Sequence, residues 1–468
     1  MAEEKGHLVS REIKGSKLIT FNLVSFGGLL ITTYYNSYAF YYYVYVVRLD
    51  ALLVSIGTMI GMMTIAFGSP IMGIISDNQP VGKHGKRKPF FLYGLPLMAL
   101  GSILTWYPPS MCLPAEPVNW VTTLYFWAMS FIMYLGTTII GAPYLGMIPE
   151  QSETEANRLE VSKVQGLFNL IAMVLGIMLP IIVQSTLEDP ENVQWYNPSG
   201  QILITIVPLL AILITAIGSI FTLATYFTVD ESFLQSPAEK KSVKRAVVQM
   251  FRPVKQPNPR NFFMTNLSMQ TGAKILLALP IPFLTYVAGV GGLTFIVYLG
   301  LILITEFVAL FVWDKIIPKT GVIKANTMGF ALITVPLLCM LVLFTGISGV
   351  AMLIFIMADF LVVAFGLIVS FLTPIPILSS IIEEAAGNGT VDARKKEAES
   401  GLYFGLYTFF TYAGVALGGI VMGICLSGGQ EENPFVLTVM LPISGIIYAL
   451  ALIYNRKLAL PALSKGSK

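Results

Sequence analysis

Charged residues are scarce in this sequence of 468 residues: 12% are Asp, Glu, Lys or Arg, while 55% are hydrophobic and the mean hydropathy is +0.74. A soluble domain carries about 25% charged residues, so the composition excludes a soluble protein and predicts an integral membrane protein. His7 and His84 are the only histidines, which leaves none for a catalytic triad or a metal cluster. Cys112, Cys339 and Cys425 lie far apart, without metal spacing or a paired framework. We therefore expect no metal and no cofactor.

The sequence also lacks a Walker motif or any other glycine-rich loop that could hold a phosphate. Its 41 glycines are spread through apolar segments, where glycine permits close helix packing. We therefore expect neither transport driven by ATP bound to this chain nor enzymatic activity. The net charge of +3 comes from basic residues in short loops, so it indicates no nucleic-acid partner. The first apolar run is too long for a cleaved signal peptide and has no cleavage site.

Apolar segments long enough to cross a bilayer recur along the whole chain. We predict an all-α membrane protein with twelve transmembrane helices in two six-helix bundles, residues 1–229 and 261–468, joined by a cytoplasmic linker at 230–260. The expected spans are 17–47, 51–76, 89–107, 119–148, 160–184, 200–229, 261–288, 290–313, 325–346, 348–381, 400–427 and 434–455.

The placement of charge along the chain predicts its orientation. With both termini in the cytoplasm, every Lys and Arg except Arg48 and Lys274 falls on the cytoplasmic side, which is the pattern expected of membrane proteins. The predicted outer loops carry acidic residues instead: Glu116, Glu188, Asp189, Glu191, Glu431 and Glu432. We expect a multi-pass protein of the cell membrane, surrounded by the lipid bilayer and monomeric.

A short basic loop, Gly73–Pro89, separates the second and third spans. Its pattern, Gly-x-x-x-Asp followed by Gly-Lys-Arg-Lys, resembles the loop signature of major facilitator superfamily transporters. A weaker copy, Trp313–Lys324, follows the second span of the other half, as expected of a transporter built from repeated halves. The alternative interpretation is a basic anchor that only sets the topology.

Several segments are similar to one branch of that superfamily, the glycoside–pentoside–hexuronide:cation symporters. They are Tyr41–Val47, Ser69–Gly73, Gly141–Glu150 with Arg158, and Glu399–Phe410. The resemblance extends over nearly the whole chain and implies the major facilitator fold and secondary transport. Related lipid carriers also resemble this sequence.

The charged residues with which that family binds cation and sugar are absent here. Their positions are taken by Ile65, Ser69, Leu29, Gly141, Gly166 and Thr411. A sodium site needs several oxygen ligands, and the second span offers only Thr64 and Ser69. Sodium coupling at the family's site and galactoside binding therefore do not carry over from the resemblance.

Lys274 in the seventh span and Asp359 in the tenth are the charges expected at membrane depth. By helical rise they lie ~21 Å from the inner end and ~16 Å from the outer end of their spans. An intramembrane charge is costly and marks a functional candidate, so we expect the two side chains to meet as a substrate and coupling site. A static ion pair that locks helix packing is the alternative. Glu306 lies nearer the cytoplasmic side and is a poorer partner for Lys274.

Helical phasing predicts which polar side chains face the transport cavity. The predicted substrate-binding residues are Asn22, Thr33, Asn36, Trp127, Tyr134, Thr138, Gln270, Lys274, Asp359 and Thr411. At the cytoplasmic side we expect polar contacts between the bundles from Asp77, Gly85, Lys86, Arg87 and Arg158, which would close the cavity as the resemblance implies.

The leading hypothesis is a secondary active transporter that moves a small polar solute, a sugar or glycoside, by alternating access. A carrier of lysolipids or organic anions is an alternative, in which Lys274 contacts the head group. A receptor or scaffold that no longer transports is another. Asp359 could couple transport to a proton, because a substrate that displaces Lys274 would let the carboxylate take up a proton. Uncoupled facilitated diffusion needs no such residue.

Overall fold

The computed structural model describes residues 12–83, 85–113, 116–152, 154–231, 242–243, 250–386 and 393–460, and within these ranges the regular structure is helical apart from two isolated β-bridges. The helices are α1 (Ser16–Tyr41), the π-helical turn η1 (Tyr42–Val46), α2 (Ala51–Asp77), α3 (Lys88–Leu104), α4 (Trp120–Gln151), α5 (Glu155–Ser185), α6 (Pro198–Thr228), the 3-10 turn η2 (Arg252–Lys255), α8 (Pro257–Ala278), α9 (Pro280–Pro282), the π-helical turn η3 (Phe283–Val287), α10 (Gly292–Thr320), α11 (Val322–Cys339), the 3-10 turn η4 (Met340–Thr345), α12 (Gly349–Leu372), α13 (Pro374–Ala386), α14 (Ala393–Leu426) and α15 (Pro434–Arg456).

The helices account for the spans expected from the sequence. Among the described residues, 10 spans are long and apolar enough to cross a membrane, and α8 with the α9–η3 segment forms a further one, bent by 42°. The remaining expected span is α3, an apolar helix of 17 residues. Its length of about 26 Å falls slightly short of a typical hydrocarbon core.

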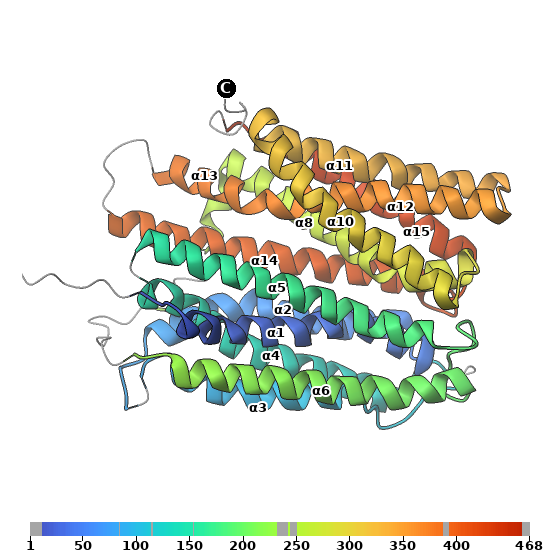
Figure 1. The fold of residues 1–468 in the computed structure, drawn as a ribbon, viewed down its shortest axis with the longest axis horizontal. Helices are drawn as coiled ribbons and strands as arrows, with labels where there is room; N and C mark the ends of the chain where they lie inside the picture. Colours follow the sequence, from blue (N-terminus) through green and yellow to red (C-terminus); the bar gives the residue numbers. More distant parts are fainter. Residues whose placement is uncertain are drawn as a thin grey trace, which may run out of the picture.

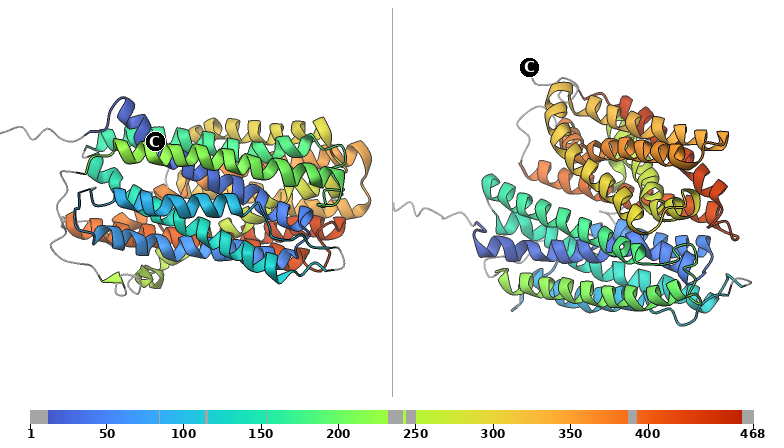
Figure 2. Two further views of the ribbon diagram at one scale, coloured as in Figure 1. Left: turned by 90° about the horizontal axis from the view of Figure 1, so that it is seen from below. Right: turned by 45° about the vertical axis from the view of Figure 1, so that its right-hand side comes forward.

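The helices pack as two groups that follow the two halves of the sequence. In the first half, α1 packs on α5 and α6, and α4 packs on α2 and α3. In the second half, α8 packs on α14 and α15, and α11 packs on α12 and α15. The two groups lie side by side, with α2 against α14 and α5 against α10 along their border (Figures 1 and 2). The helices are thus grouped by sequence half, and the predicted bounds of the two bundles and the linker stay a prediction. Within the predicted linker, residues 232–241 and 244–249 lie outside the described residues.

Glycines allow neighbouring helices to approach closely inside each half. A Cβ atom on Gly136 of α4 would lie 2.2 Å from the backbone nitrogen of Met98 in α3. A Cβ atom on Gly329 of α11 would lie 2.0 Å from a methyl group of Val369 in α12. Close approach strengthens van der Waals packing where no hydrophobic effect acts between lipid-embedded helices.

The two ends of the molecule differ in their charge. We call the end that carries Asp77, Lys86 and Arg87 the basic end, and the end that carries Arg48 and Glu431 the acidic end. The α1–η1 span runs from the basic to the acidic end, and α2 returns to the basic end. The α3 helix starts again at the basic end, at the left in Figure 1.

Candidate functional site

A polar cluster joins the two halves near the middle of the molecule. Tyr134 of α4 donates a hydrogen bond of 2.8 Å to the side-chain Oδ1 of Asn36 in α1. Lys274 of α8, in the other half, donates to the backbone carbonyl oxygen of the same Asn36 at 3.4 Å. Tyr134 is fully buried and Lys274 is 8% exposed. Three of the predicted substrate-binding residues are therefore brought together where the halves meet.

Glycines of the neighbouring helices place these side chains. A Cβ atom on Gly61 of α2 would lie 2.3 Å from the Tyr134 ring, so only glycine leaves room for the ring there. On the other side, a Cβ atom on Gly418 of α14 would lie 2.9 Å from the Cβ of Lys274. Gly414, one turn earlier, lies against Gln270 in the same way. The α8–α14 contact therefore fixes the backbone of both Gln270 and Lys274.

Asp359 does not pair with Lys274, so the expected meeting of the two charges is wrong for this structure. No ion pair or hydrogen bond joins them, although both residues are described, and the buried Oδ2 of Asp359 has no hydrogen-bond partner. Asp359 lies on α12 next to Phe360, whose ring contacts Phe283 of η3 at 5.6 Å. The reason is topological: α12 packs on α10 and α11, whereas α8 packs on α14 and α15. Within the described part of the chain neither side chain forms an ion pair, an arrangement that is costly for a charge at membrane depth.

Trp127 and Thr138 contact α2, although they were expected to face the substrate. The indole Nε1 of Trp127 donates to the carbonyl oxygen of Leu53 at 2.8 Å. The Thr138 hydroxyl donates to the Tyr134 carbonyl within its own helix at 2.7 Å, and its methyl group lies against Gly68. These contacts assign both side chains to packing between α2 and α4. Helical phasing identified the correct face of α4 but could not show that α2 covers it.

The remaining predicted residues lie on both sides of the border between the halves. Asn22 of α1 accepts a hydrogen bond of 3.1 Å from Tyr144 of α4. Thr33 packs against Gly176 of α5. In the second half, Asn266 of α8 donates to the Thr411 hydroxyl of α14 at 2.7 Å.

Sequence reasoning missed Tyr144 and Asn266, which hydrogen-bond predicted residues from a neighbouring helix. Tyr144 falls inside the Gly141–Glu150 segment that carries the family resemblance, so a signal was present. Asn266 lies one turn before Gln270 on α8. Asn266 would have been a candidate if the sequence had shown that α8 packs on α14.

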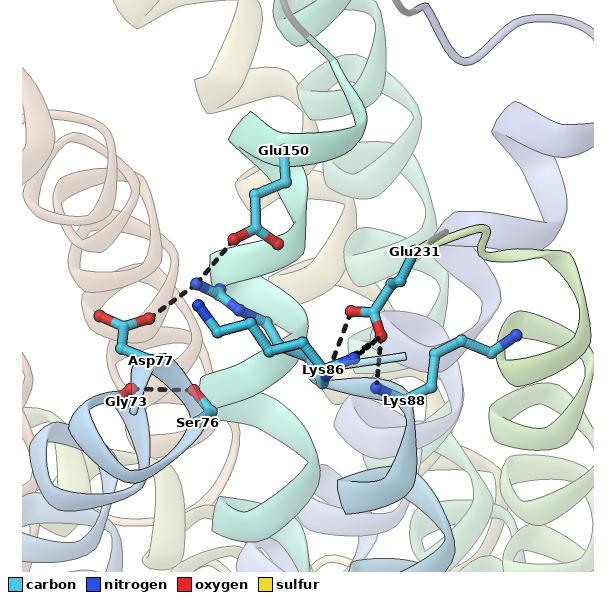
Figure 3. A network of polar contacts seen from close by, with 8 residues as sticks. Gly73, Ser76, Asp77, Lys86, Lys88, Glu150 and Glu231 are labelled. Atoms are coloured by element: carbon cyan, nitrogen blue, oxygen red, sulfur yellow. Dashed lines mark hydrogen bonds and ion pairs between the residues drawn. The ribbon is translucent and has the colours of Figure 1, made fainter. Parts of the chain in front are cut away.

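The basic loop forms a network that ties together four segments of the first half (Figure 3). The guanidinium of Arg87 pairs with Asp77 at the end of α2, at 2.7 Å, and with Glu150 near the end of α4, at 3.0 Å. The carboxylate of Glu231, which follows α6, accepts hydrogen bonds from the backbone N–H groups of Lys86, Arg87 and Lys88 (Figure 3). An acceptor at the first turn of α3 satisfies N–H groups that have no partner within the helix.

Gly85 and Arg158 support the same part of the first half. Gly85 has a φ of 89°, and a Cβ atom there would lie 2.1 Å from the Glu231 carboxylate. Arg158 donates from Nε to the carbonyl oxygen of Ser152 at 2.8 Å. The described contacts of the predicted gate residues thus lie within one half, where contacts between the bundles were expected. Glu150 and Glu231 were missed as partners of the loop: Glu150 lies in the Gly141–Glu150 segment that carries the family resemblance, but nothing in the sequence links either residue to Arg87.

Polar contacts between the halves gather at the acidic end, at residues that were not among the predicted site residues. Arg48, between α1 and α2, forms ion pairs with Glu431 and Glu432, between α14 and α15. Gln194, which precedes α6, also donates to Glu432 at 3.2 Å. Ion pairs therefore join the two halves at the acidic end in this conformation.

The fold and the polar cluster between its halves define a class of protein, the secondary transporters with the major facilitator fold. A model of the MFS/sugar transport protein family matches residues 20–433. The chain belongs to this family, and it is a multi-pass membrane transporter and not an enzyme.

One curated relative is an uncharacterized symporter, sll1374, of Synechocystis sp. (strain ATCC 27184 / PCC 6803 / Kazusa). It is 23% identical over 195 residues, which cover 42% of this chain and about a third (34%) of the relative's length.

The structure resembles solved transporters over most of its length. A mutant of the nucleoside transporter NupG matches with a TM-score of 0.64 at 12% identity, covering 95% of this chain and 100% of that one. A bacterial homologue of the human lysosomal transporter Spinster, solved in an inward-facing and unoccupied conformation, matches with a TM-score of 0.59 at 11% identity, covering 95% of this chain and 97% of that one. At such identities these matches establish the fold alone.

Proposed function

We propose that this protein is a secondary active transporter that moves a small polar solute, a sugar or glycoside, by alternating access between the two halves. The observation that carries the proposal is the Asn36–Tyr134–Lys274 cluster. It draws on α1 and α4 from one half and α8 from the other, so a rocking motion of the halves must rearrange it. A site at the interface of repeated halves is the usual place for substrate in such transporters.

We further propose that the basic end faces the cytoplasm, with both termini on that side. The distribution of Lys and Arg supports this orientation. The bridged acidic end then closes the outer side, and substrate reaches the cluster from the cytoplasm. Cysteine labelling tests the orientation: reaction at an exposed residue of the acidic end, such as Glu188→Cys, is expected only from outside, and labelling only from inside would overturn it.

The chemistry of the cluster supports a solute rich in hydroxyl or amide groups. Asn36 and Tyr134 supply both donors and acceptors, and Asn22 and Tyr144, nearer the basic end of the same two helices, form a second amide–phenol pair. The names of the structural neighbours and of the family, nucleoside and sugar transporters, fit the same class.

A pair of Tyr→Phe variants tests the position of the site. Tyr134→Phe removes the hydrogen bond to Asn36 and is expected to weaken substrate binding about five- to tenfold, the cost of one buried hydrogen bond. Tyr448→Phe is the matched control, because Tyr448 is fully buried and its hydroxyl has no hydrogen-bond partner among the described residues. Sugars, glycosides and nucleosides are screened by thermal shift and then by uptake into liposomes. Equal affinities in the two variants would remove Tyr134 from the site.

A carrier of lysolipids or organic anions is the second candidate. It is favoured by Lys274, whose buried ammonium contacts a backbone carbonyl and has no described carboxylate partner. Lys274→Gln would then abolish binding of the acid and spare a neutral analogue. A chain that binds none of these compounds and supports no uptake in liposomes would instead be a receptor or scaffold.

We also propose that transport is coupled to a proton through Asp359. Its support is the buried, unpartnered carboxylate oxygen and the word symporter in the relative's name. Uncoupled diffusion is the alternative that the Asp359 variant described in the Discussion would reveal.

A further inference from the structure

The first helix of each half ends in the same unusual way at the acidic end. The α1 helix continues into the π-helical turn η1, and α8 continues through α9 into the π-helical turn η3. Single π turns are rare and occur often at functional sites. Tyr45 of η1 and Tyr286 of η3 stack on each other across the border of the halves, with ring centroids 5.7 Å apart and planes at 17°.

Each of these two tyrosines also hydrogen-bonds the opposite half. The Tyr45 hydroxyl donates to the backbone carbonyl of Glu431, in the second half, at 2.8 Å. The Tyr286 hydroxyl donates to the backbone carbonyl of Glu191, in the first half, at 3.1 Å. The contact is therefore reciprocal, because each half supplies one phenol and one loop carbonyl.

Arg48 adds the charged part of this contact from a strained backbone position. It has a φ of 69°, which side chains other than glycine rarely adopt. The preceding turn is held in place from its own half, since the carbonyls of Val46 and Val47 accept hydrogen bonds from Trp195 and Cys112. Such strain persists where surrounding contacts over-determine it, and here it directs the guanidinium to Glu431 and Glu432.

Asp50 extends the contact by using its two carboxylate oxygens separately. Its Oδ1 caps α2 by accepting from the N–H of Leu52 at 2.9 Å. Its Oδ2 accepts from the N–H of Gly428, in the second half, at 3.1 Å. The start of α2 is thus fixed to the α14–α15 loop.

We propose that Tyr45, Arg48 and Asp50 of the first half, with Tyr286, Glu431 and Glu432 of the second, form a clasp that holds the acidic end shut and opens as one unit. All its members contact the opposite half. Interactions that exist in only one of two states set the equilibrium between them. Opening the clasp is the step that exposes the central cluster to the outer side.

Distance measurements between spin labels test the clasp without knowledge of the substrate. Labels at Glu188→Cys and Ser348→Cys, two exposed residues of the acidic end in opposite halves, report its opening in a chain whose three native cysteines are replaced. Arg48→Gln is expected to raise the population with a long distance about tenfold. The double variant Tyr45→Phe, Tyr286→Phe keeps the stacked rings, removes both hydroxyl bonds and is expected to shift the population in the same direction.

Arg260→Gln is the control, since Arg260 is an exposed arginine of α8 at the basic end. It is expected to leave the distances unchanged. If Arg48→Gln does not fold, the double variant decides alone. Native distances in a folded double variant, or an equal shift in the Arg260 control, would overturn the clasp, and neither result bears on whether the chain transports.

Discussion

Gly146 of α4 lies directly against the guanidinium of Arg87, and its replacement by alanine tests the basic-end network. A Cβ atom at this position would lie 1.3 Å from the Nη1 of Arg87. Non-bonded heavy atoms keep about 3.5 Å apart, so the guanidinium must move by about 2 Å. Its contacts to Asp77 and Glu150, now 2.7 and 3.0 Å, would then exceed hydrogen-bonding distance.

The expected loss follows from the strength of these contacts and their exposure. A hydrogen bond to a charged group contributes about 1.5–3 kcal/mol. The Asp77 and Glu150 side chains are 35% and 21% exposed, so solvent screening reduces the loss for the pair to about 2 kcal/mol. Alanine stabilises a helix by about 0.5–1 kcal/mol relative to glycine. The variant is therefore compared with a second Gly→Ala variant on the same helix, which has the same gain.

Gly141→Ala provides that control, because a Cβ atom at Gly141 meets no atom within 4 Å. We expect Gly146→Ala to unfold about 2–4 °C below Gly141→Ala in detergent, followed by intrinsic fluorescence. Adding Arg87→Gln should cost little in the Gly146→Ala background, since both changes remove the same contacts. Equal Tm values for the two alanine variants would refute the reasoning.

Three further outcomes follow from the charges at the two ends and in the middle. Asp77→Asn should slow transport while expression and folding stay near normal, and full activity would reduce the loop to a topology signal. Asp359→Asn should abolish uphill uptake but spare counterflow, and unchanged accumulation would exclude Asp359 as the coupling site. Burial raises the pKa of Glu431 above its ordinary value of 4.5, although Arg48 opposes the shift and Glu432 and Asp50 add to it. The closed clasp therefore binds a proton more tightly than an open state with Glu431 in water, and closure is favoured as the pH falls through the raised pKa toward 4.5. The spin-label distances should shorten on acidification and lose this response in Glu431→Gln; lengthening on acidification would contradict the sign.

The helices were predictable because each span is a long apolar run bounded by polar residues. The π-helical turns were not, since Tyr42–Val46 and Phe283–Val287 continue the apolar pattern of the helices before them. Asn36, Tyr134 and Lys274 were each chosen as substrate-binding residues, which stays a prediction, and the structure brings the three into contact. Asp359 satisfied the criterion that singled out Lys274, a charge at membrane depth, yet its helix packs on α10 and α11 and not on α8.

The sequence by itself determined the apolar spans, the family resemblance, the loss of the family's carboxylates and the basic loop. These are local properties, since apolar length and residue identity need no knowledge of neighbouring helices. Only the tertiary structure decided which helices face each other. It thereby decided that Arg87 joins segments within one half and that Arg48 joins the two halves. Contacts between residues separated by up to hundreds of positions depend on helix packing, and hydropathy contains no information about packing partners.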